Sequence, residues 1–154
     1  MTKFFQRFGS MIFALAVSWC ANAGSEPSEQ LKSRLSALEG QVVYVDFWAS
    51  WCGPCRQSFP WLNVMQAQYK SRGFTVLSVN VDAKKSFALA FLEEFPASFE
   101  VIYDPKGKIA RQYDLRGMPS SFIVDRTGEV VATHVGFNEQ KQQQYEQEII
   151  ALLK

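Results

Sequence analysis

Two cysteines separated by two residues are the part of this sequence best suited to chemistry. Cys52 and Cys55 enclose Gly53 and Pro54, and such a pair is either a redox dithiol or half of a metal site. The thiolate is the attacking species in disulfide exchange. At a helix N-terminus the unpaired N–H groups and the helix dipole stabilise that anion. We therefore expect Cys52 to be an exposed nucleophile at the start of a helix. Cys55, one turn later, would attack the mixed disulfide and release the substrate.

Two other roles for this cysteine pair have less support. A closed zinc site needs four ligands, and outside the N-terminal segment the sequence adds only His134 to the two cysteines. A purely structural disulfide here would close a loop too short to restrict the unfolded chain much. We therefore expect no metal, and we expect His134 to have a strand-surface or packing role. No G-x-G-x-x-G fingerprint is present, so we expect no flavin or nicotinamide cofactor.

The segments around the cysteines predict how they are positioned. Residues 42–48 are apolar on both faces, as in a central parallel strand. A turn is expected at 49–54 and a helix at 55–71, closed by Gly73. Pro60 should kink that helix because its ring displaces one backbone hydrogen bond.

The rest of the chain alternates between strand and helix patterns. Further elements are expected as strands at 74–81, 99–103, 121–124 and 129–135, and as helices at 31–39, 86–95, 109–113 and 139–153, after a polar leader at 24–30. The helix at 86–95 bears Phe87 and Phe91, and turns are expected at 104–107 and 125–128. This order predicts an α/β domain with a mixed central β-sheet flanked by helices.

Length and composition exclude several classes of protein. The chain has 154 residues, enough for one domain, and 47% of them are hydrophobic, which excludes a wholly disordered chain. The net charge is +1 with no basic stripe, so we expect no nucleic-acid partner. No apolar heptad run predicts association, so we expect a monomer.

The first 23 residues have the pattern of a signal peptide. Lys3 and Arg7 precede a short apolar run at 11–19, and residues 21–23 read Ala-Asn-Ala. We expect cleavage after residue 23, with an uncleaved membrane anchor as the alternative. A lipoprotein cysteine at position 20 is disfavoured by the tryptophan before it. The expected organisation is a signal peptide at 1–23 and one domain at 24–154, with its core at about 41–154.

Several motifs resemble one known family. Residues 45–55, Val-Asp-Phe-Trp-Ala-Ser-Trp-Cys-Gly-Pro-Cys, closely resemble the active-site segment of thioredoxins, and Pro60 matches the helix proline of that family. Residues 117–125, Gly-Met-Pro-Ser-Ser-Phe-Ile-Val-Asp, resemble its cis-proline loop and the strand after it. The long stretch at 74–117 and the export signal are similar to the TlpA/ResA-like extracytoplasmic branch. The resemblance implies a thioredoxin fold with a short insertion between the βαβ unit and the C-terminal ββα unit.

The resemblance also implies roles for residues near the dithiol. Asp46 matches a buried acid that helps proton transfer at the second cysteine, and burial would raise its pKa towards the range of a general base. Met118–Pro119 would be a cis peptide bond lying against the dithiol, with a backbone that pairs with the substrate chain. These residues join Cys52 and Cys55 as candidate site residues.

Three further residues are expected to face the substrate. Trp51 would form an apolar rim for docking, with ordinary packing as the alternative, and Trp48 is expected in the core. Gly53 and Pro54 form the dipeptide of reducing thioredoxins, whereas strong oxidants of this fold place a histidine there. We therefore expect a low reduction potential.

Together these features predict an exported thiol–disulfide oxidoreductase that reduces disulfide-containing protein substrates in the periplasm. Cytochrome c maturation and periplasmic redox homeostasis are the candidate settings. Because the periplasm is oxidising and the chain shows no cofactor motif, we expect a membrane-embedded thiol reductase as the electron donor. The alternatives are a disulfide oxidase or isomerase, or a peptide-binding module that uses the cis-proline groove.

Overall fold

The computed structural model describes residues 26–154. In chain order these residues form the following elements: α1 (Pro27–Ala37), β1 (Val42–Trp48), α2 (Gly53–Tyr69), a 3₁₀ turn (Lys70–Arg72), β2 (Phe74–Asn80), α3 (Lys85–Glu94), β3 (Glu100–Tyr103), α4 (Lys108–Gln112), β4 (Ser120–Val124), β5 (Val130–Val135) and α5 (Glu139–Leu152). The proposed signal peptide lies outside the described residues. Within residues 26–154 no helix is both long and apolar enough to cross a bilayer.

The five strands form one mixed sheet in the order β3-β2-β1-β4-β5. β1 pairs in parallel with β2 and antiparallel with β4, and β4 and β5 form an antiparallel hairpin. All seven residues of β1 are buried, because the strand lies at the centre of the sheet and both of its faces are covered. The predicted α/β class, with a mixed sheet flanked by helices, is confirmed.

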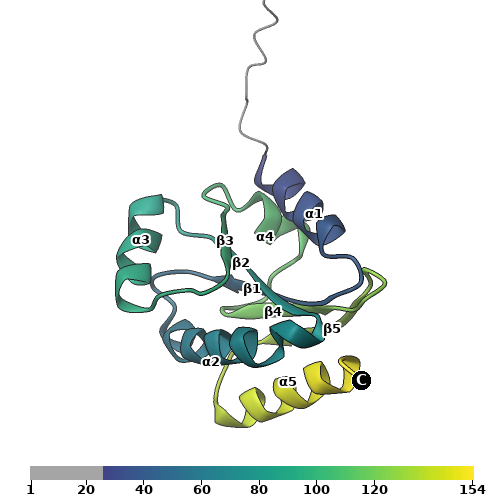
Figure 1. Cartoon of the computed structure of the whole chain (residues 1–154). Coiled ribbons are helices and arrows are strands. Elements are labelled where there is room, and N and C mark those ends of the chain that lie inside the picture. The colour runs from purple at the N-terminus through teal and green to yellow at the C-terminus, as the bar shows by residue number, and fades with distance from the viewer. Residues whose placement is uncertain (1–25) are drawn as a thin grey trace, which may run out of the picture.

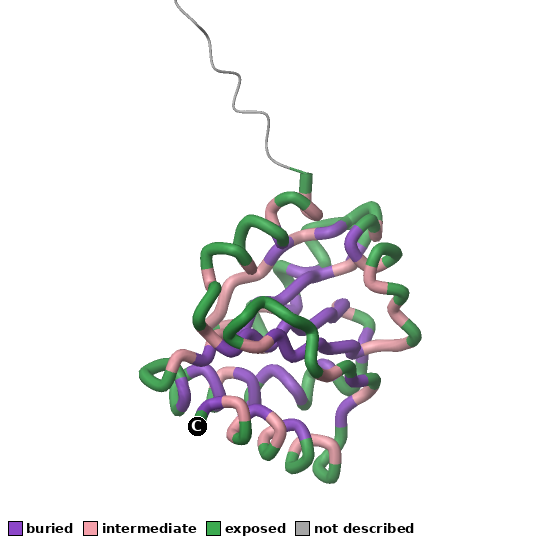
Figure 2. Tube along the Cα trace, turned by 90° about the vertical axis from the view of Figure 1, so that its right-hand side faces the viewer, coloured by how far each residue is buried: buried purple, intermediate pink, exposed green. Residues whose placement is uncertain are grey.

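Helices cover the two faces of the sheet (Figure 1). On one face Tyr44 packs with residues of α2 and α5, including Leu62 and Ile149. On the other face Phe47 packs with Leu31 of α1 and Ile109 of α4, among others. Figure 2 shows the strands as the buried centre of the molecule, with exposed backbone on the turns and outer helix surfaces. Because β1 contributes to both layers, its carboxyl end is held from both sides.

The segment between β2 and α4 adds a helix and an edge strand, as the sequence predicted. β3 pairs in parallel with β2 and extends the sheet on that side. α3 is anchored by Ala88 and Phe91, which belong to an apolar cluster that also contains Cys52 and Cys55. The added segment therefore packs directly against the candidate site.

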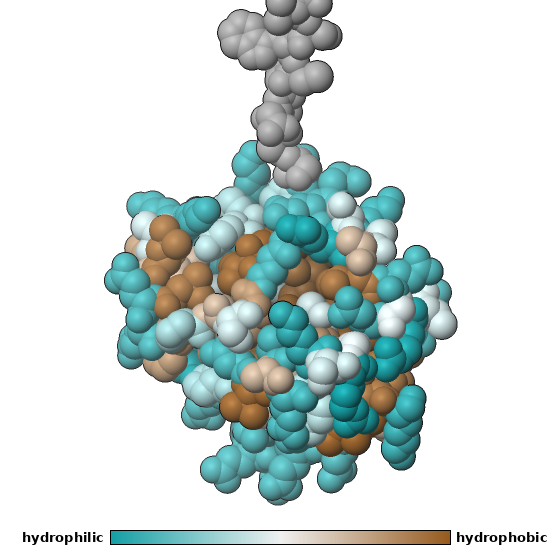
Figure 3. Space-filling view, viewed as in Figure 1, coloured by the Kyte–Doolittle hydropathy of each residue, from teal (hydrophilic) through white to brown (hydrophobic). Residues whose placement is uncertain are grey.

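The starts of two helices differ from the sequence prediction. α1 begins at Pro27, so part of the expected leader is helical; proline suits a first helical turn, whose N–H groups have no intrahelical partner. For the same reason α2 begins at Gly53, two residues before the expected start, and it continues through Pro60. Phe87 is 52% exposed. With Leu89 it contributes to the apolar surface over α3 that is visible in Figure 3.

Candidate active site

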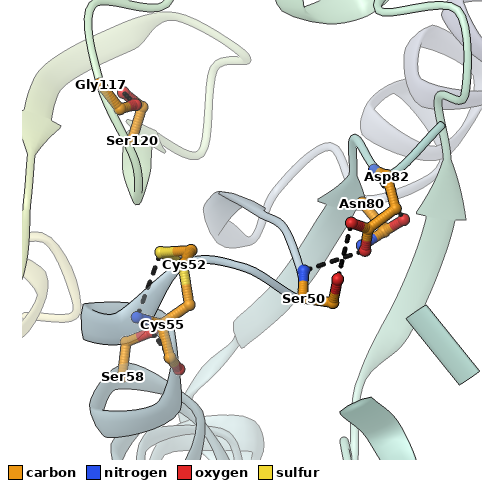
Figure 4. Close-up of a disulfide and its surroundings, with 8 residues drawn as sticks. All are labelled: Ser50, Cys52, Cys55, Ser58, Asn80, Asp82, Gly117 and Ser120. Atoms are coloured by element: carbon orange, nitrogen blue, oxygen red, sulfur yellow. Dashed lines mark hydrogen bonds between the residues drawn. A yellow bond between two sulfur atoms is a disulfide. The ribbon is translucent and has the colours of Figure 1, made fainter. Parts of the chain in front are cut away.

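Cys52 and Cys55 lie where β1 has ended and α2 begins, as the sequence predicted. Cys52 is the N-cap residue of α2, and its sulfur accepts a hydrogen bond from the Cys55 backbone N–H at 3.3 Å (Figure 4). The two Cα atoms are 5.3 Å apart and the sulfurs form a disulfide. The helix turn therefore brings the sulfurs together and directs an N–H group at Cys52, an arrangement that stabilises a thiolate there.

The two sulfurs are less exposed than expected. Cys52 is only 3% exposed and Cys55 is fully buried, so the expectation of an exposed nucleophile is wrong for this disulfide form. The reason is packing: both cysteines lie in an apolar cluster with Trp48 and Phe59, and Met118 packs against it. Cys52 is the more accessible of the two, which agrees with the predicted order of attack.

The loop at 117–120 lies beside the disulfide (Figure 4). The Met118–Pro119 peptide bond is cis, as predicted. The Ser120 hydroxyl donates to the Gly117 carbonyl at 2.7 Å, and Gly136 N–H donates to the Pro119 carbonyl at 2.7 Å. Pro119 is buried and, as a proline, has no backbone N–H. It therefore offers the site no hydrogen-bond donor.

An exposed rim surrounds the cysteines on the helix side. Trp51 is 66% exposed, and Gly53 and Pro54 are also exposed. Trp48, by contrast, is fully buried, and its indole N–H donates to the Ser78 hydroxyl at 3.2 Å. Trp51 therefore lies on the surface beside the cysteines, and Trp48 lies in the core, as expected.

Sequence reasoning missed the group that holds the turn before Cys52. The Asp82 carboxylate, on the loop after β2, accepts hydrogen bonds from the Ser50 N–H at 2.9 Å and the Ser50 hydroxyl at 2.8 Å. The Asn80 side chain donates to the same carboxylate at 2.8 Å (Figure 4). The sequence did contain a sign of this contact, the Val-Asn-Val-Asp run at the end of a buried strand. Buried polar side chains such as this Asn and Asp need hydrogen-bond partners.

Asp46 is buried, as expected. Side chains alternate along a strand, so it shares a face of β1 with Tyr44 and Trp48. Tyr44 packs edge-on against Trp61 of α2, with ring centroids 5.6 Å apart, so this is the face that α2 covers. Asp46 is 2% exposed and its Oδ2 has no hydrogen-bond partner. Burial therefore raises the pKa of its carboxyl well above the usual value.

His134 is buried rather than on the strand surface. It is 7% exposed, and its ring stacks on Tyr145 of α5 with centroids 3.8 Å apart. Nε2 lies 2.7 Å from Glu148 Oε2, and Nδ1 lies 3.4 Å from the Ser121 hydroxyl. Burial raises the pKa of Glu148, but hydrogen bonds from Gln144 and His134 outweigh it, so the net pKa is lowered.

The described residues contain no group of three or more His, Cys, Asp or Glu side chains arranged to hold a metal ion. A cleft of about 450 Å³ lies between α1 and α4, and neither cysteine lines it. The candidate site consists of the two sulfurs, the buried Asp46 and the exposed surface around the cysteines.

Comparisons with known proteins agree with this geometry. The Redoxin family model matches residues 23–149. Among curated relatives, the thiol-disulfide oxidoreductase ResA of Oceanobacillus iheyensis is 32% identical over 106 residues, which cover 69% of this chain and 55% of the relative. ResA of Bacillus cereus is 31% identical over 118 residues, covering 77% and 67%. The chain thus spans about half the length of the first relative and two thirds of the second.

Solved structures with this fold include two informative relatives. A Chlorobium tepidum protein assigned as thiol:disulfide interchange protein DsbE is 56% identical, with a TM-score of 0.76 over 78% of this chain and 85% of that one. The exposed lipoprotein thioredoxin Etrx1 of Streptococcus pneumoniae is 29% identical, with a TM-score of 0.66 over 77% and 90%.

Proposed function

The chain belongs to the redoxin family, and from this premise we propose that it is a thiol–disulfide oxidoreductase that reduces protein disulfides through Cys52 and Cys55. The single observation that carries the proposal is the position of Cys52 at the N-cap of α2, where it accepts the Cys55 N–H. A thiolate at that position is stabilised by the helix N-terminus, and the second sulfur lies within bonding distance.

The proposed reaction proceeds in two exchange steps. In the reduced protein the Cys52 thiolate attacks one sulfur of the substrate disulfide, and the other substrate sulfur leaves as a thiolate and takes up a proton. Cys55 then loses its proton, and its thiolate attacks the Cys52 sulfur and displaces the second substrate thiolate. Two electrons pass to the substrate, and the protein ends as the Cys52–Cys55 disulfide.

Asp46 is proposed as the base that accepts the Cys55 proton. Its burial on the face covered by α2 supports this role, because a carboxyl whose pKa is raised by burial holds a proton more readily near neutral pH.

The substrate is proposed to dock over the exposed surface around the disulfide. Trp51 would cover apolar substrate side chains, and Gly53 and Pro54 would let the substrate backbone approach. Met118 and Pro119 would pair with it along an extended segment. The names of the relatives, thiol-disulfide oxidoreductase and thiol:disulfide interchange protein, support a protein-disulfide substrate.

We propose reduction as the direction of electron flow because no histidine stands between the cysteines. The setting would be the periplasm, with cytochrome c maturation as one candidate pathway and a membrane-embedded thiol reductase as the donor. Stopped-flow mixing of the oxidised protein with candidate membrane donors tests the donor. Failure to be reduced by any donor of the host membrane would contradict it.

The reduction potential of the Cys52–Cys55 pair tests the direction. The purified chain would be equilibrated against glutathione or dithiothreitol buffers and its dithiol fraction measured by alkylation and mass spectrometry. A value at or below about −230 mV supports a dedicated reductant, whereas a value near about −120 mV reverses the flow and indicates a disulfide oxidase. A peptide-binding module is the other candidate, and it would keep its function in a Cys52→Ser variant.

A further inference from the structure

Four buried polar residues line up across four strands of the sheet. Asp46 is the register partner of Ser78 on β2 and of Ser121 on β4, and Ser121 is in turn the partner of His134 on β5. Register partners share a face of the sheet. All four are at most 7% exposed. This polar row therefore runs from beneath α2, where Asp46 lies, to the edge strand β5.

The outer half of the polar row is joined by hydrogen bonds and ends at solvent. The Ser121 hydroxyl donates to the Tyr44 hydroxyl at 2.7 Å and lies 3.4 Å from His134 Nδ1. His134 Nε2 lies 2.7 Å from Glu148, whose side chain is 33% exposed, against 6% for His134. Each of these groups can both receive and pass on a proton.

Each end of the buried part presents an acceptor. If Glu148 is a carboxylate, His134 donates from Nε2, so its Nδ1 is an acceptor that faces Ser121; this tautomer is assigned from the hydrogen-bond network. The Ser121 hydroxyl lies 2.7 Å from the Tyr44 hydroxyl and 3.4 Å from Nδ1, so its proton can be directed at either. At the other end Asp46 Oδ2 has no partner.

We propose that Tyr44, Ser121, His134 and Glu148 form the route by which Asp46 exchanges its proton with solvent. The proposal rests on the function proposed above, in which Asp46 takes the Cys55 proton during the second exchange step. A base buried to 2% exposure needs such a route, because burial favours its protonated form and it must release that proton before it can take the one on Cys55.

The transfer conserves protons at every group. Tyr44 lies two residues before Asp46 on the same face of β1; after rotation of the carboxyl, or through one intervening water, it accepts the Asp46 proton and gives its own to Ser121. For this transfer the Ser121 hydroxyl first turns from Tyr44 to His134 Nδ1, so that it gives its own proton to the histidine and receives the one from Tyr44. The histidine then passes the Nε2 proton to Glu148 or to water. One proton leaves Asp46 and one reaches solvent, while His134 is left with its proton on Nδ1. An inward transfer through the same groups, which returns a proton to Asp46 when the disulfide is reduced again, restores the starting tautomer.

The groups that face His134 from every packed element are consistent with this role. They are Glu148 and Tyr145 from α5, Tyr44 from β1 and Ser121 from β4. None of them is a cation. A transient positive charge on His134 therefore meets one carboxylate and no repulsive partner.

The test separates the two exchange steps with 5,5′-dithiobis(2-nitrobenzoate). In stopped flow, the first thionitrobenzoate released reports attack by Cys52, and the second reports attack by Cys55. We expect Ser121→Ala and His134→Phe to slow the second release about tenfold at neutral pH while the first is unchanged. Thr133→Val, an exposed position beside His134 on the opposite face of β5, should change neither release.

The same changes made in an Asp46→Asn background assign the effect to Asp46. There, Ser121→Ala should slow the second release no further. The route is overturned if both single variants release the second thionitrobenzoate at the wild-type rate. It is also overturned if Ser121→Ala slows that release equally in the wild-type and Asp46→Asn backgrounds. Thermal melting verifies that the variants fold; Ser121→Ala removes a single hydroxyl and is the decisive variant if His134→Phe unfolds. A wild-type protein that releases no second equivalent would instead contradict the proposed function itself.

Discussion

Ser50 is bound to Asp82 twice, through its backbone N–H at 2.9 Å and its hydroxyl at 2.8 Å. Ser50 stands two residues before Cys52 on the turn that leaves β1, and Asp82 follows β2. Because Asp82 is 3% exposed, this pair ties the turn that carries the nucleophile to the neighbouring strand end.

Replacing Asp82 should therefore loosen that turn. Asp82→Ala removes three hydrogen bonds to one buried carboxylate and should lower the free energy of unfolding by about 2 kcal/mol, measured by urea denaturation. Disulfide-reductase activity should also fall. Asp125→Ala, which removes a partly exposed carboxylate that orders the β4–β5 turn, is the matched control and should leave activity unchanged. Equal loss of activity in both variants would contradict a specific role for Asp82.

Replacing Cys52 and replacing Cys55 should stop the reaction at different steps. Cys52→Ser should abolish disulfide reduction because the capping thiolate is lost. Cys55→Ser should stop after the first exchange and accumulate a covalent complex with the substrate. Mass spectrometry under non-reducing conditions detects that complex. If it accumulated with Cys52→Ser and not with Cys55→Ser, the assigned order of attack would be reversed.

Asp46 should make the protein less stable as the pH rises. Its pKa is raised by burial in the folded state, so the folded protein holds this proton at pH values where the unfolded chain has released it. The contribution is complete below the unfolded pKa of about 3.9 and is lost as the pH rises through the folded pKa. Asp46→Asn should remove this dependence.

Oxidised protein should be used for that comparison, so that no cysteine titrates. We expect Asp46→Asn to match the wild type near pH 3.5 and to exceed it at pH 8, by about 1.4 kcal/mol for each unit of pKa difference, in urea titrations. Parallel stability curves for the two proteins across this pH range would show that Asp46 titrates normally.

Trp51 should matter for protein substrates alone. Its side chain is 66% exposed, so Trp51→Ala should leave the free energy of unfolding within about 0.5 kcal/mol of the wild type. We expect kcat/KM for a protein disulfide to fall severalfold, with little change for oxidised glutathione, because a small disulfide does not reach the rim. Val64→Ala on α2, at a residue 57% exposed, is the control for loss of exposed apolar surface. Equal losses with both substrates would argue against docking.

The sequence alone was enough to predict the features that depend on local residue patterns. Three features were predicted because each is determined by neighbouring residues. They are the buried strand β1, the turn at 104–107 and the dithiol at the start of α2. The burial of Asp46 also followed from its position inside that run. The start of a helix shifted by more than one residue only at α1 and α2, where proline suits a first helical turn.

Features that depend on strand register could not be predicted. Ser78, Asp46, Ser121 and His134 become one row only when four strands are aligned, and a shift of one residue in any strand would remove its member from that face. His134 was therefore assigned a packing or surface role from its sequence distance to the cysteines. Helical spacing likewise did not determine which side of α3 would be buried: Phe91 is buried, whereas Phe87 is 52% exposed.

The direction of the polar row separates the release of the proton from the docking of the partner protein. It leads sideways through the sheet to Glu148 in the second half of α5, whereas the disulfide lies beyond the end of β1, at the start of α2. A partner that covers Trp51 and the loop at 117–120 without reaching α5 would leave this outlet in water. With the route proposed here, the protein can therefore shed its proton while the encounter complex is still closed, so its resetting need not await partner dissociation.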